Sequence, residues 1–384
     1  MNLNMTEPDS TAHRRIGIRC HLRRWIFVTL MALYCLAIFF ALDFLYSNLF
    51  FSESPNAPGL RIPNAVFDHT LAANYEGYER WGEARYRIAT NSLGFKDATM
   101  RYVAPRGNSR RVVLIGDSLT EGIGVPFEQS FAGMLALAGQ QRRDKTEFLN
   151  AAVVSYSPTL YYRKIKFLLD SGLKFDELVV LPDLSDVQDE ATSYFCSDDN
   201  PKYAALCRPE STYQPVRYEK PHEPHGVLSR NFRLSNALLR QLWVLRGGAK
   251  GEATTPSDRI GWSVPNFDVG NMYAPLGVEG GITRAVQHMQ ALAELLKRQN
   301  IPLTVVVYPW PLSLVQDDPG GRWVTIWRDF CAINCKAFIN TFPDFIAAKD
   351  AHSDWYVRYF ILGDIHFSLA GHKLVFDALK RNGL

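Results

Sequence analysis

A serine and an aspartate–histidine pair stand far apart in the chain, and together they are the residue types that acyl transfer requires. Ser118 ends the stretch RVVLIGDS, a run of apolar residues that stops at a polar turn. Asp364 and His366 lie near the other end of the chain, in ILGDIHF. A serine hydroxyl is a poor nucleophile near neutral pH and needs an adjacent base. We therefore expect a triad in which Ser118 is the nucleophile, His366 the base and Asp364 the group that orients the histidine.

The spacing within the pair supports this assignment. One residue separates Asp364 from His366, and on an extended segment both side chains would point to the same side. The plain alternatives are that Ser118 is an ordinary turn residue and that His366 is a surface or core histidine. Asp117 is expected to cap the helix that follows it, because aspartate accepts hydrogen bonds from free N–H groups at a helix start. His372 is expected to lie at the start of a helix.

Strands and helices alternate around these residues. Strands are expected at RRVVLIGD, TEFLNAAVV, DELVVLPD and IPLTVVVYPW, and helices at SFAGMLALAG, TLYYRKIKFLLDSGL, GITRAVQHMQALAELLKRQN, GGRWVTIWRDFCAINCKAFI and SLAGHKLVFDALKRN. This alternation predicts an α/β fold with three layers, α/β/α, around a doubly wound, mostly parallel sheet. Ligands bind such sheets beyond the carboxyl ends of the strands, near a reversal of strand order. Three polar loops follow strands and are expected to converge there: Gly116-Asp117-Ser118, SYSP from Ser155 and DLSD from Asp183.

The alternation lapses over about residues 192–275, which are rich in proline, glycine and polar residues. A structureless loop of that length is implausible in a compact domain, so we expect an insertion that covers or shapes the site, with one helix at LSNALLRQLWVLRG. His222 and His225 in PHEPH could suggest a metal, but a proline-rich loop is favoured. Just before the insertion, the acidic residues Asp186, Asp189 and Glu190 are expected to form either a solvated loop or a substrate contact.

The apolar run Trp25–Leu42 predicts a transmembrane helix within residues 25–50. A cleaved signal peptide and a buried soluble helix are the alternatives. The run is long for a signal peptide, no A-x-A-like site follows it, and it has no polar face. Arginines precede the run and the next basic residue after it is Arg61, so residues 1–24 are expected to be a cytoplasmic tail. The remaining chain would then lie in the periplasm or outside the cell, anchored in the inner (cytoplasmic) membrane.

Residues 51–109 are expected to be a short β-containing lead-in, and residues 110–384 the catalytic domain. An oxidising compartment favours disulfides among the four exported cysteines, most simply Cys196–Cys207 and Cys331–Cys335. A zinc site is the rival interpretation, but no C-x-x-C pair occurs.

Composition narrows the possible classes of protein. The net charge is +3 and no Lys/Arg block carries interleaved aromatic residues, so no nucleic-acid partner is expected. The chain has no H-E-x-x-H, G-x-S-x-G or Walker motif, which argues against zinc proteases, α/β-hydrolases and nucleotide hydrolases. No cofactor or metal is expected, because serine acyl transfer needs none.

GDSLTEG and the D-x-H near the C-terminus resemble motifs of the SGNH (GDSL-type) hydrolase superfamily, over roughly residues 110–384. The resemblance extends to membrane-anchored bacterial members and implies a flavodoxin-like fold. Its first block, Gly116-Asp117-Ser118-Leu119, matches fully. Ser155 stands where the family usually has glycine and Ser185 where it usually has asparagine, and many members have two residues between the aspartate and the histidine. A D-x-H followed by an aromatic residue, here Phe367, is similar to the motif of alginate O-acetyltransferase relatives.

The resemblance also implies an oxyanion hole. Its donors would be the backbone N–H groups of Ser118 and Ser155, and the Ser185 hydroxyl in place of an asparagine amide. Losing one such donor typically lowers the rate by about 10²–10³. The shorter Ser185 hydroxyl is therefore the main departure from the family pattern.

Three functions are compatible with these residues. The first is an ester hydrolase that removes acyl groups from a cell-envelope carbohydrate or a small ester. The second is an O-acetyltransferase for an exported polysaccharide, which would need a membrane partner protein to deliver acyl groups. The third is a non-catalytic glycan-binding or scaffold protein that keeps the fold.

Overall fold

The structure is a computed structural model that describes residues 10–49, 57, 59–81, 84–142, 145–195, 231–245, 258–264, 266–315 and 321–384. The chain divides into two compact units. One contains residues 1–54 and 222–246, with the long helix α1 (Ser10–Leu49) and the shorter α8 (Arg233–Leu245). The other contains residues 55–221 and 247–384 and holds the sheet. Within α1, the segment Arg24–Leu49 is long and apolar enough to cross a membrane. A signal sequence near an N-terminus can have the same length and composition.

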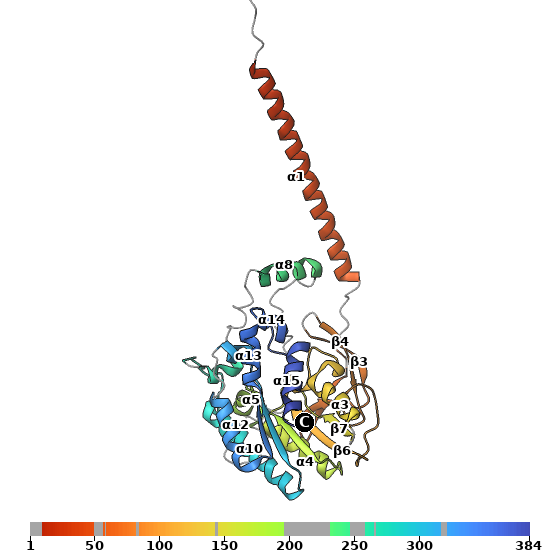
Figure 1. Ribbon diagram of the computed structural model, residues 1–384, viewed down its shortest axis with the longest axis vertical. Helices are drawn as coiled ribbons and strands as arrows, with labels where there is room; N and C mark the ends of the chain where they lie inside the picture. Colours follow the sequence, from red (N-terminus) through yellow and green to blue (C-terminus); the bar gives the residue numbers. More distant parts are fainter. Residues whose placement is uncertain are drawn as a thin grey trace, which may run out of the picture. The chain divides into compact units, whose positions relative to one another are not determined.

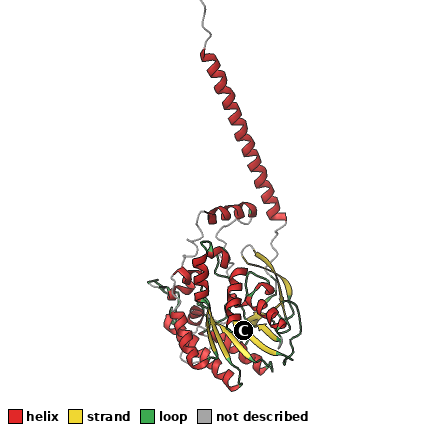
Figure 2. Ribbon diagram, viewed as in Figure 1, coloured by secondary structure: helices red, strands yellow, loops and turns green. Residues whose placement is uncertain are grey.

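The second unit is built on one eight-stranded sheet (Figures 1 and 2). Five strands are parallel, in the order β10-β9-β8-β6-β7, and three antiparallel strands continue the sheet as β5-β4-β3. The parallel strands are β6 (Arg110–Gly116), β7 (Thr146–Asn150), β8 (Glu177–Leu181), β9 (Leu303–Val307) and β10 (Ala337–Asn340). The antiparallel ones are β3 (Glu76–Trp81), β4 (Ala84–Thr90) and β5 (Lys96–Asp97), and a separate hairpin pairs β1 (Arg61–Asn64) with β2 (Asp68–Leu71).

Helices cover both faces of the sheet, which confirms the expected three-layer, doubly wound α/β fold (Figure 1). On one face α4 (Pro158–Asp170), α5 (Asp186–Thr192), α10 (Gly277–Arg298) and α12 (Arg322–Asn334) pack together. On the other face lie α3 (Phe131–Gln141), α13 (Phe342–Ala351), α14 (Trp355–Tyr359) and α15 (Leu369–Arg381). Because both faces are covered, the middle of the central strand β6 is apolar: Val112, Val113, Leu114 and Ile115 are all fully buried. Short helical segments are α2 (Ser118–Glu121), η1 (Phe127–Gln129), η3 (Asp258–Ser263) and α11 (Pro311–Val315).

The sequence prediction was wrong where α12 ends and β10 begins, and the strand predicted at TEFLNAAVV ends earlier, at Asn150. The helix expected through GGRWVTIWRDFCAINCKAFI ends at Asn334, and Cys335 is already extended, with φ −112° and ψ 152°. The residues that follow form β10, which pairs in parallel with β9 and places Phe338 beside Val305. The aromatic and β-branched residues of AFIN suit a strand, but they also continued the helical apolar spacing. Tertiary pairing with β9 decided between the two.

A disulfide joins Cys331 to Cys335 across the end of α12, as predicted. Cys196, Cys207, His222 and His225 lie outside the described residues.

The lead-in contributes directly to the sheet. Strands β3, β4 and β5 come from residues before 110, and β5 pairs with β7 through Lys96 and Asn150. The lead-in, which follows α1 in the sequence, is therefore part of the same sheet as β6, the strand that precedes Ser118.

Candidate active site

The three polar loops predicted to converge do follow neighbouring strands. In chain order the parallel strands are arranged 2-1-3-4-5, so the direction of winding reverses at β6. Strands β7 and β8 flank β6 on its two sides, and all three run parallel. Their carboxyl ends therefore share one edge of the sheet, at the position where open α/β sheets bind ligands.

The turn after β6 presents Ser118 at this edge. Gly116 is required there because an added Cβ would lie 2.7 Å from the Leu181 carbonyl oxygen of β8. Asp117 caps the next helix turn, as predicted: its Oδ1 accepts a hydrogen bond from Leu119 N at 3.0 Å. The Ser118 side chain is buried at the first position of α2 and its Oγ donates to Asp117 Oδ2 at 3.2 Å. Tyr308, which follows β9, donates from its hydroxyl to Asp117 Oδ1 at 3.2 Å.

Asp364 and His366 are hydrogen-bonded to each other, His366 Nδ1 lying 2.6 Å from Asp364 Oδ1. The predicted extended segment was wrong, because these residues form a bend before α15. Asp364 Oδ1 also accepts from the backbone N–H groups of Ile365 at 2.5 Å and His366 at 3.1 Å. These two hydrogen bonds bend the backbone around the Asp364 carboxylate. The pair meets through this turn rather than through strand alternation.

The lead-in supplies a further partner that sequence analysis missed. Trp81, the last residue of β3, donates its indole N–H to Asp364 Oδ2. Its ring also packs edge-on against the His366 imidazole, with ring centroids 4.9 Å apart. Both carboxylate oxygens are thus occupied, and the imidazole is fixed in position by a hydrogen bond and a ring contact. A tryptophan 283 positions before the aspartate leaves no local pattern that would reveal it.

Burial and neighbouring charges set the titration of the pair. Burial alone would lower the pKa of His366, but the Asp364 carboxylate, followed by Asp117 and Asp183, raises it above the usual 6.5. Burial alone would raise the pKa of Asp364, but the His366 imidazole and the hydrogen bonds to its oxygens bring it below the usual 3.8. The pair is therefore stabilised as a carboxylate beside a readily protonated imidazole.

The second nitrogen of His366 is open. Nε2 is buried and has no hydrogen-bond partner within the described part of the chain. The charges of His366 and Asp117 act on each other's pKa, so the imidazole lies within electrostatic range of the turn that holds Ser118. Burial and the Asp183 carboxylate raise the pKa of Asp117, and the His366 imidazole lowers it. An imidazole with one nitrogen fixed and the other free has the arrangement that a general base requires.

Ser155 has the backbone conformation that explains why glycine is usual at this place in the family it resembles. Its φ is +58°, in the left-handed region. Hydrogen bonds hold the loop on both sides: Val154 N donates to Glu121 Oε2 at 2.8 Å, His69 Nε2 lies 2.7 Å from Val154 O, and the Tyr194 hydroxyl donates to Ser155 O at 2.7 Å. Glu121 belongs to GDSLTEG itself, so one motif presents the serine and fixes the neighbouring loop.

We expect Ser155→Gly to keep activity within about threefold and to change stability little. Relief of the left-handed strain, worth about 1–2 kcal/mol, is offset by the greater freedom of glycine in the unfolded chain. Ser155→Val should lower kcat by about 10²-fold, because a β-branched residue resists positive φ and would shift the backbone N–H. Initial rates and thermal unfolding of both variants measure this. Full activity in the valine variant would exclude the Ser155 N–H as an oxyanion donor.

The Ser185 hydroxyl is directed at a carboxylate. It donates to Asp183 Oδ1 at 2.6 Å, and its backbone N–H donates to the same oxygen at 2.8 Å. Trp310 Nε1 donates to the other oxygen, Asp183 Oδ2, at 2.8 Å. A hydroxyl has a single proton to donate, and in this structure Asp183 receives it. The role of Ser185 as a third oxyanion donor stays a prediction that substitution can test.

We expect Ser185→Ala to lower kcat by less than about tenfold and to destabilise the fold by about 1 kcal/mol, the usual net value of a hydrogen bond. Rates and unfolding midpoints of the purified variant check both values. A loss of about 10²–10³ in kcat with normal folding would instead identify the hydroxyl as an oxyanion donor.

The solvated loop expected at residues 186–190 was wrong, because these residues belong to the buried helix α5, and a substrate contact there stays a prediction. Asp186 and Glu190 are fully buried rather than solvated. Asp186 Oδ2 accepts from Asp183 N at 3.0 Å, and Glu190 accepts from Thr159 N at 2.7 Å at the start of α4. They hold the loops after β8 and β7 in place. No group of acidic, histidine or cysteine side chains among the described residues is arranged to hold a metal ion.

Arg259, in η3 of the insertion, lies close to the same edge of the sheet. It pairs with Asp189. Burial alone would lower the pKa of Arg259, but the charges of Asp189, Asp183 and Asp117 raise it further above its usual high value. The insertion therefore brings a permanent cation near the Asp117–Ser118 turn.

No family model matches the chain, and neither does any curated protein. Among solved structures, the chain is similar to a catalytic mutant of the acetylxylan esterase Axe2 from Geobacillus stearothermophilus, with 10% identity, a TM-score of 0.38 and coverage of 72% of this chain and 95% of that one. It is also similar to a member of the lipolytic G-D-S-L family from Veillonella parvula, with 10% identity, a TM-score of 0.38 and coverage of 72% and 100%. A third is the acetyl xylan esterase AlAXEase, with 14% identity, a TM-score of 0.39 and coverage of 71% and 100%.

Proposed function

We propose that the chain is a serine-dependent ester hydrolase that acts through an acyl-enzyme. One arrangement supports the proposal: Asp364 fixes the buried His366 imidazole through Nδ1, and its Nε2 has no hydrogen-bond partner among the described residues. The resting Ser118 hydroxyl donates to Asp117, and it must rotate toward His366 to react. Catalytic hydrogen bonds of this kind often tighten only when substrate is bound.

The reaction has two balanced halves. Ser118 Oγ attacks the acyl carbonyl carbon while His366 Nε2 takes the hydroxyl proton, and the carbonyl electron pair moves to oxygen. The N–H groups of Ser118 and Ser155 donate to that oxyanion. The intermediate collapses, the ester C–O bond breaks, and His366 returns the proton to the departing alcohol. Water then attacks the acyl carbon of the acyl-enzyme and loses a proton to His366. The bond from the acyl carbon to Ser118 Oγ breaks and His366 returns the proton to Oγ, which gives a carboxylic acid and the free serine.

The substrate class follows from the proposed location. If residues 25–50 span the cytoplasmic membrane with the arginine-rich end inside, the catalytic unit works in the periplasm or at the cell surface. O-acyl groups on cell-envelope carbohydrate are esters found on that side of the membrane, and we propose them as the substrate. The Asp364–His366–Phe367 sequence favours a second candidate, in which a sugar hydroxyl replaces water and the chain is an O-acetyltransferase that works with a membrane acyl-transfer partner.

Supplying an acyl donor and a glycan acceptor together to the full-length protein separates the two. Release of free acid without acylated glycan supports the hydrolase, and acylated glycan supports the transferase. Absence of both products from a folded protein, over a panel of acetyl esters and acetylated polysaccharides, would refute both and favour the non-catalytic alternative.

A further inference from the structure

An aspartate interrupts the apolar part of α1, and the structure shows its partners. Asp43 is fully buried, although most residues around it on α1 are exposed. Its Oδ1 accepts from Leu234 N at 2.9 Å, and its Oδ2 accepts from Ser235 N at 2.7 Å and from Ser235 Oγ at 2.6 Å. Ser47, one turn further along α1, accepts from Arg233 N at 3.0 Å. Two side chains of α1 thus cap the first turn of α8, whose N–H groups have no acceptor within their own helix.

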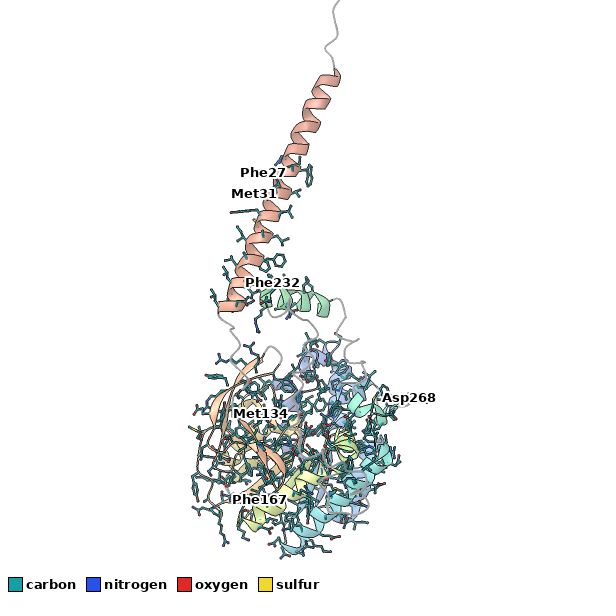
Figure 3. All side chains as sticks on the ribbon, turned by 180° about the vertical axis from the view of Figure 1, so that it is seen from behind. Phe27, Met31, Met134, Phe167, Phe232 and Asp268 are labelled. Atoms are coloured by element: carbon teal, nitrogen blue, oxygen red, sulfur yellow. A yellow bond between two sulfur atoms is a disulfide. The ribbon has the colours of Figure 1, made fainter. Side chains whose placement is uncertain are left out.

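An aromatic contact fixes the same junction. Phe232, just before α8, packs against Phe40 and Phe44 of α1 with ring centroids 5.9 and 5.8 Å apart. Figure 3 shows Phe232 where the two helices meet. Hydrogen bonds and ring packing together hold the start of α8 on the C-terminal part of α1.

The remainder of α8 presents apolar side chains that nothing described covers. Four leucines are 45–64% exposed: Leu234, Leu238, Leu239 and Leu242. Their spacing of four, one and three residues places them on one side of a helix. A soluble helix rarely leaves such a row open to water, so this face needs an apolar partner.

We infer that α8 lies in the surface of the membrane that α1 crosses, with its leucine face turned toward the acyl chains. The inference rests on the proposal that α1 spans a membrane. The 26-residue segment Arg24–Leu49 is about 39 Å long, against about 30 Å of hydrocarbon, so its ends reach the headgroup region. Asp43 lies roughly 9 Å before that C-terminal end, which is close to the hydrocarbon boundary.

This depth suits both α8 and the Asp43 carboxylate. An amphipathic helix at a membrane surface buries its apolar face about 5–10 Å into the boundary between headgroups and acyl chains. A carboxylate near the hydrocarbon is costly unless it is paired, and the positive N-terminal end of α8 supplies hydrogen-bond donors and a favourable dipole. Capping by Asp43 also gives the span a role after export, which a cleaved signal peptide would not have.

Photocrosslinking tests the inference in the full-length protein in vesicles of phosphatidylethanolamine and phosphatidylglycerol. A diazirine amino acid in place of Leu238 should form lipid adducts, detected by mass spectrometry, at least fivefold more often than the same probe in place of Ala237. Ala237 is also exposed but lies about 100° around the helix. Adducts with a second copy or with another protein would overturn the inference, as would equal lipid labelling at both positions or no adduct at all.

Two further measurements test the capping role of Asp43 and the membrane span separately. Asp43→Ala should reduce the lipid adducts at position 238 about fivefold, because loss of a helix cap costs about that factor in helix population. Asn48→Ala, which removes only a hydrogen bond within α1, should not reduce them. Unchanged labelling in the Asp43 variant would contradict the capping role. Alkaline carbonate extraction of the wild-type protein reports separately on spanning: release from the vesicles would refute the anchor itself.

Discussion

Ser118→Ala is expected to reduce ester turnover by on the order of 10⁶-fold, to a residual rate that binding and the oxyanion donors alone can sustain. The variant loses the Ser118 hydroxyl, which is the proposed nucleophile, while the turn keeps its Asp117 cap. A fluorophosphonate probe should label the wild-type protein and leave the alanine variant unlabelled. Equal unfolding midpoints would confirm that the fold is intact.

Ser171→Ala is the matched control, because Ser171 is an exposed serine at the C-terminal end of α4, the opposite end of that helix from the loop that holds Ser155. It should label and turn over as the wild type does. Labelling that survives Ser118→Ala would locate the nucleophile elsewhere or show that the probe reacts non-specifically, and either result ends the triad assignment.

Asp364→Asn is expected to lower kcat by about 10⁴-fold, because an amide at this position favours the wrong tautomer of the histidine. The pH profile should change as well. The base must be neutral to act, so wild-type kcat/KM falls as the pH drops through the raised pKa of His366, above 6.5. In the variant the carboxylate is gone while burial still lowers the pKa, so this limb should move to lower pH. Rates measured between pH 4 and 9, a range chosen around the usual histidine value of about 6.5, test both effects.

Trp81→Phe and Asp354→Asn complete this series. Trp81→Phe removes one hydrogen bond from Asp364 and should lower kcat by less than Asp364→Asn does. The acidic limb of the pH profile should also shift detectably. Asp354 pairs with Arg358 at the surface, and its substitution should leave both rate and profile unchanged. An unchanged pH limb in Asp364→Asn would mean that His366 is not the group that titrates in catalysis.

The sequence was sufficient for features that depend on local pattern. Full burial on both faces makes β6 a continuous apolar run, and Gly116 and Asp117 follow from a tight turn and a helix cap, so the position of Ser118 could be predicted. The disulfide between Cys331 and Cys335 followed from close spacing.

Features that depend on distant pairing could not be predicted. The strand at Ala337–Asn340 exists because β9 offers a partner, and its apolar spacing alone fitted a helix. Trp81 reaches Asp364 only after β3 has joined the sheet, and Arg259 pairs with Asp189 from 70 positions further along the chain. The bend that joins Asp364 to His366 depends on hydrogen bonds of one carboxylate to the next two backbone N–H groups, which spacing does not reveal.

The antiparallel strands β5, β4 and β3 have a consequence for any shortened version of the protein. A fragment starting near residue 110 would contain every motif of the triad, yet it would lack Trp81 and would leave β7 as an uncovered edge. Free strand edges pair readily with other chains, so such a fragment is expected to aggregate. Without Trp81, the Asp364–His366 pair is also expected to be less firmly positioned. A shortened version should therefore begin before the β1 hairpin, and insertions between α1 and β3 should affect the rate of the reaction.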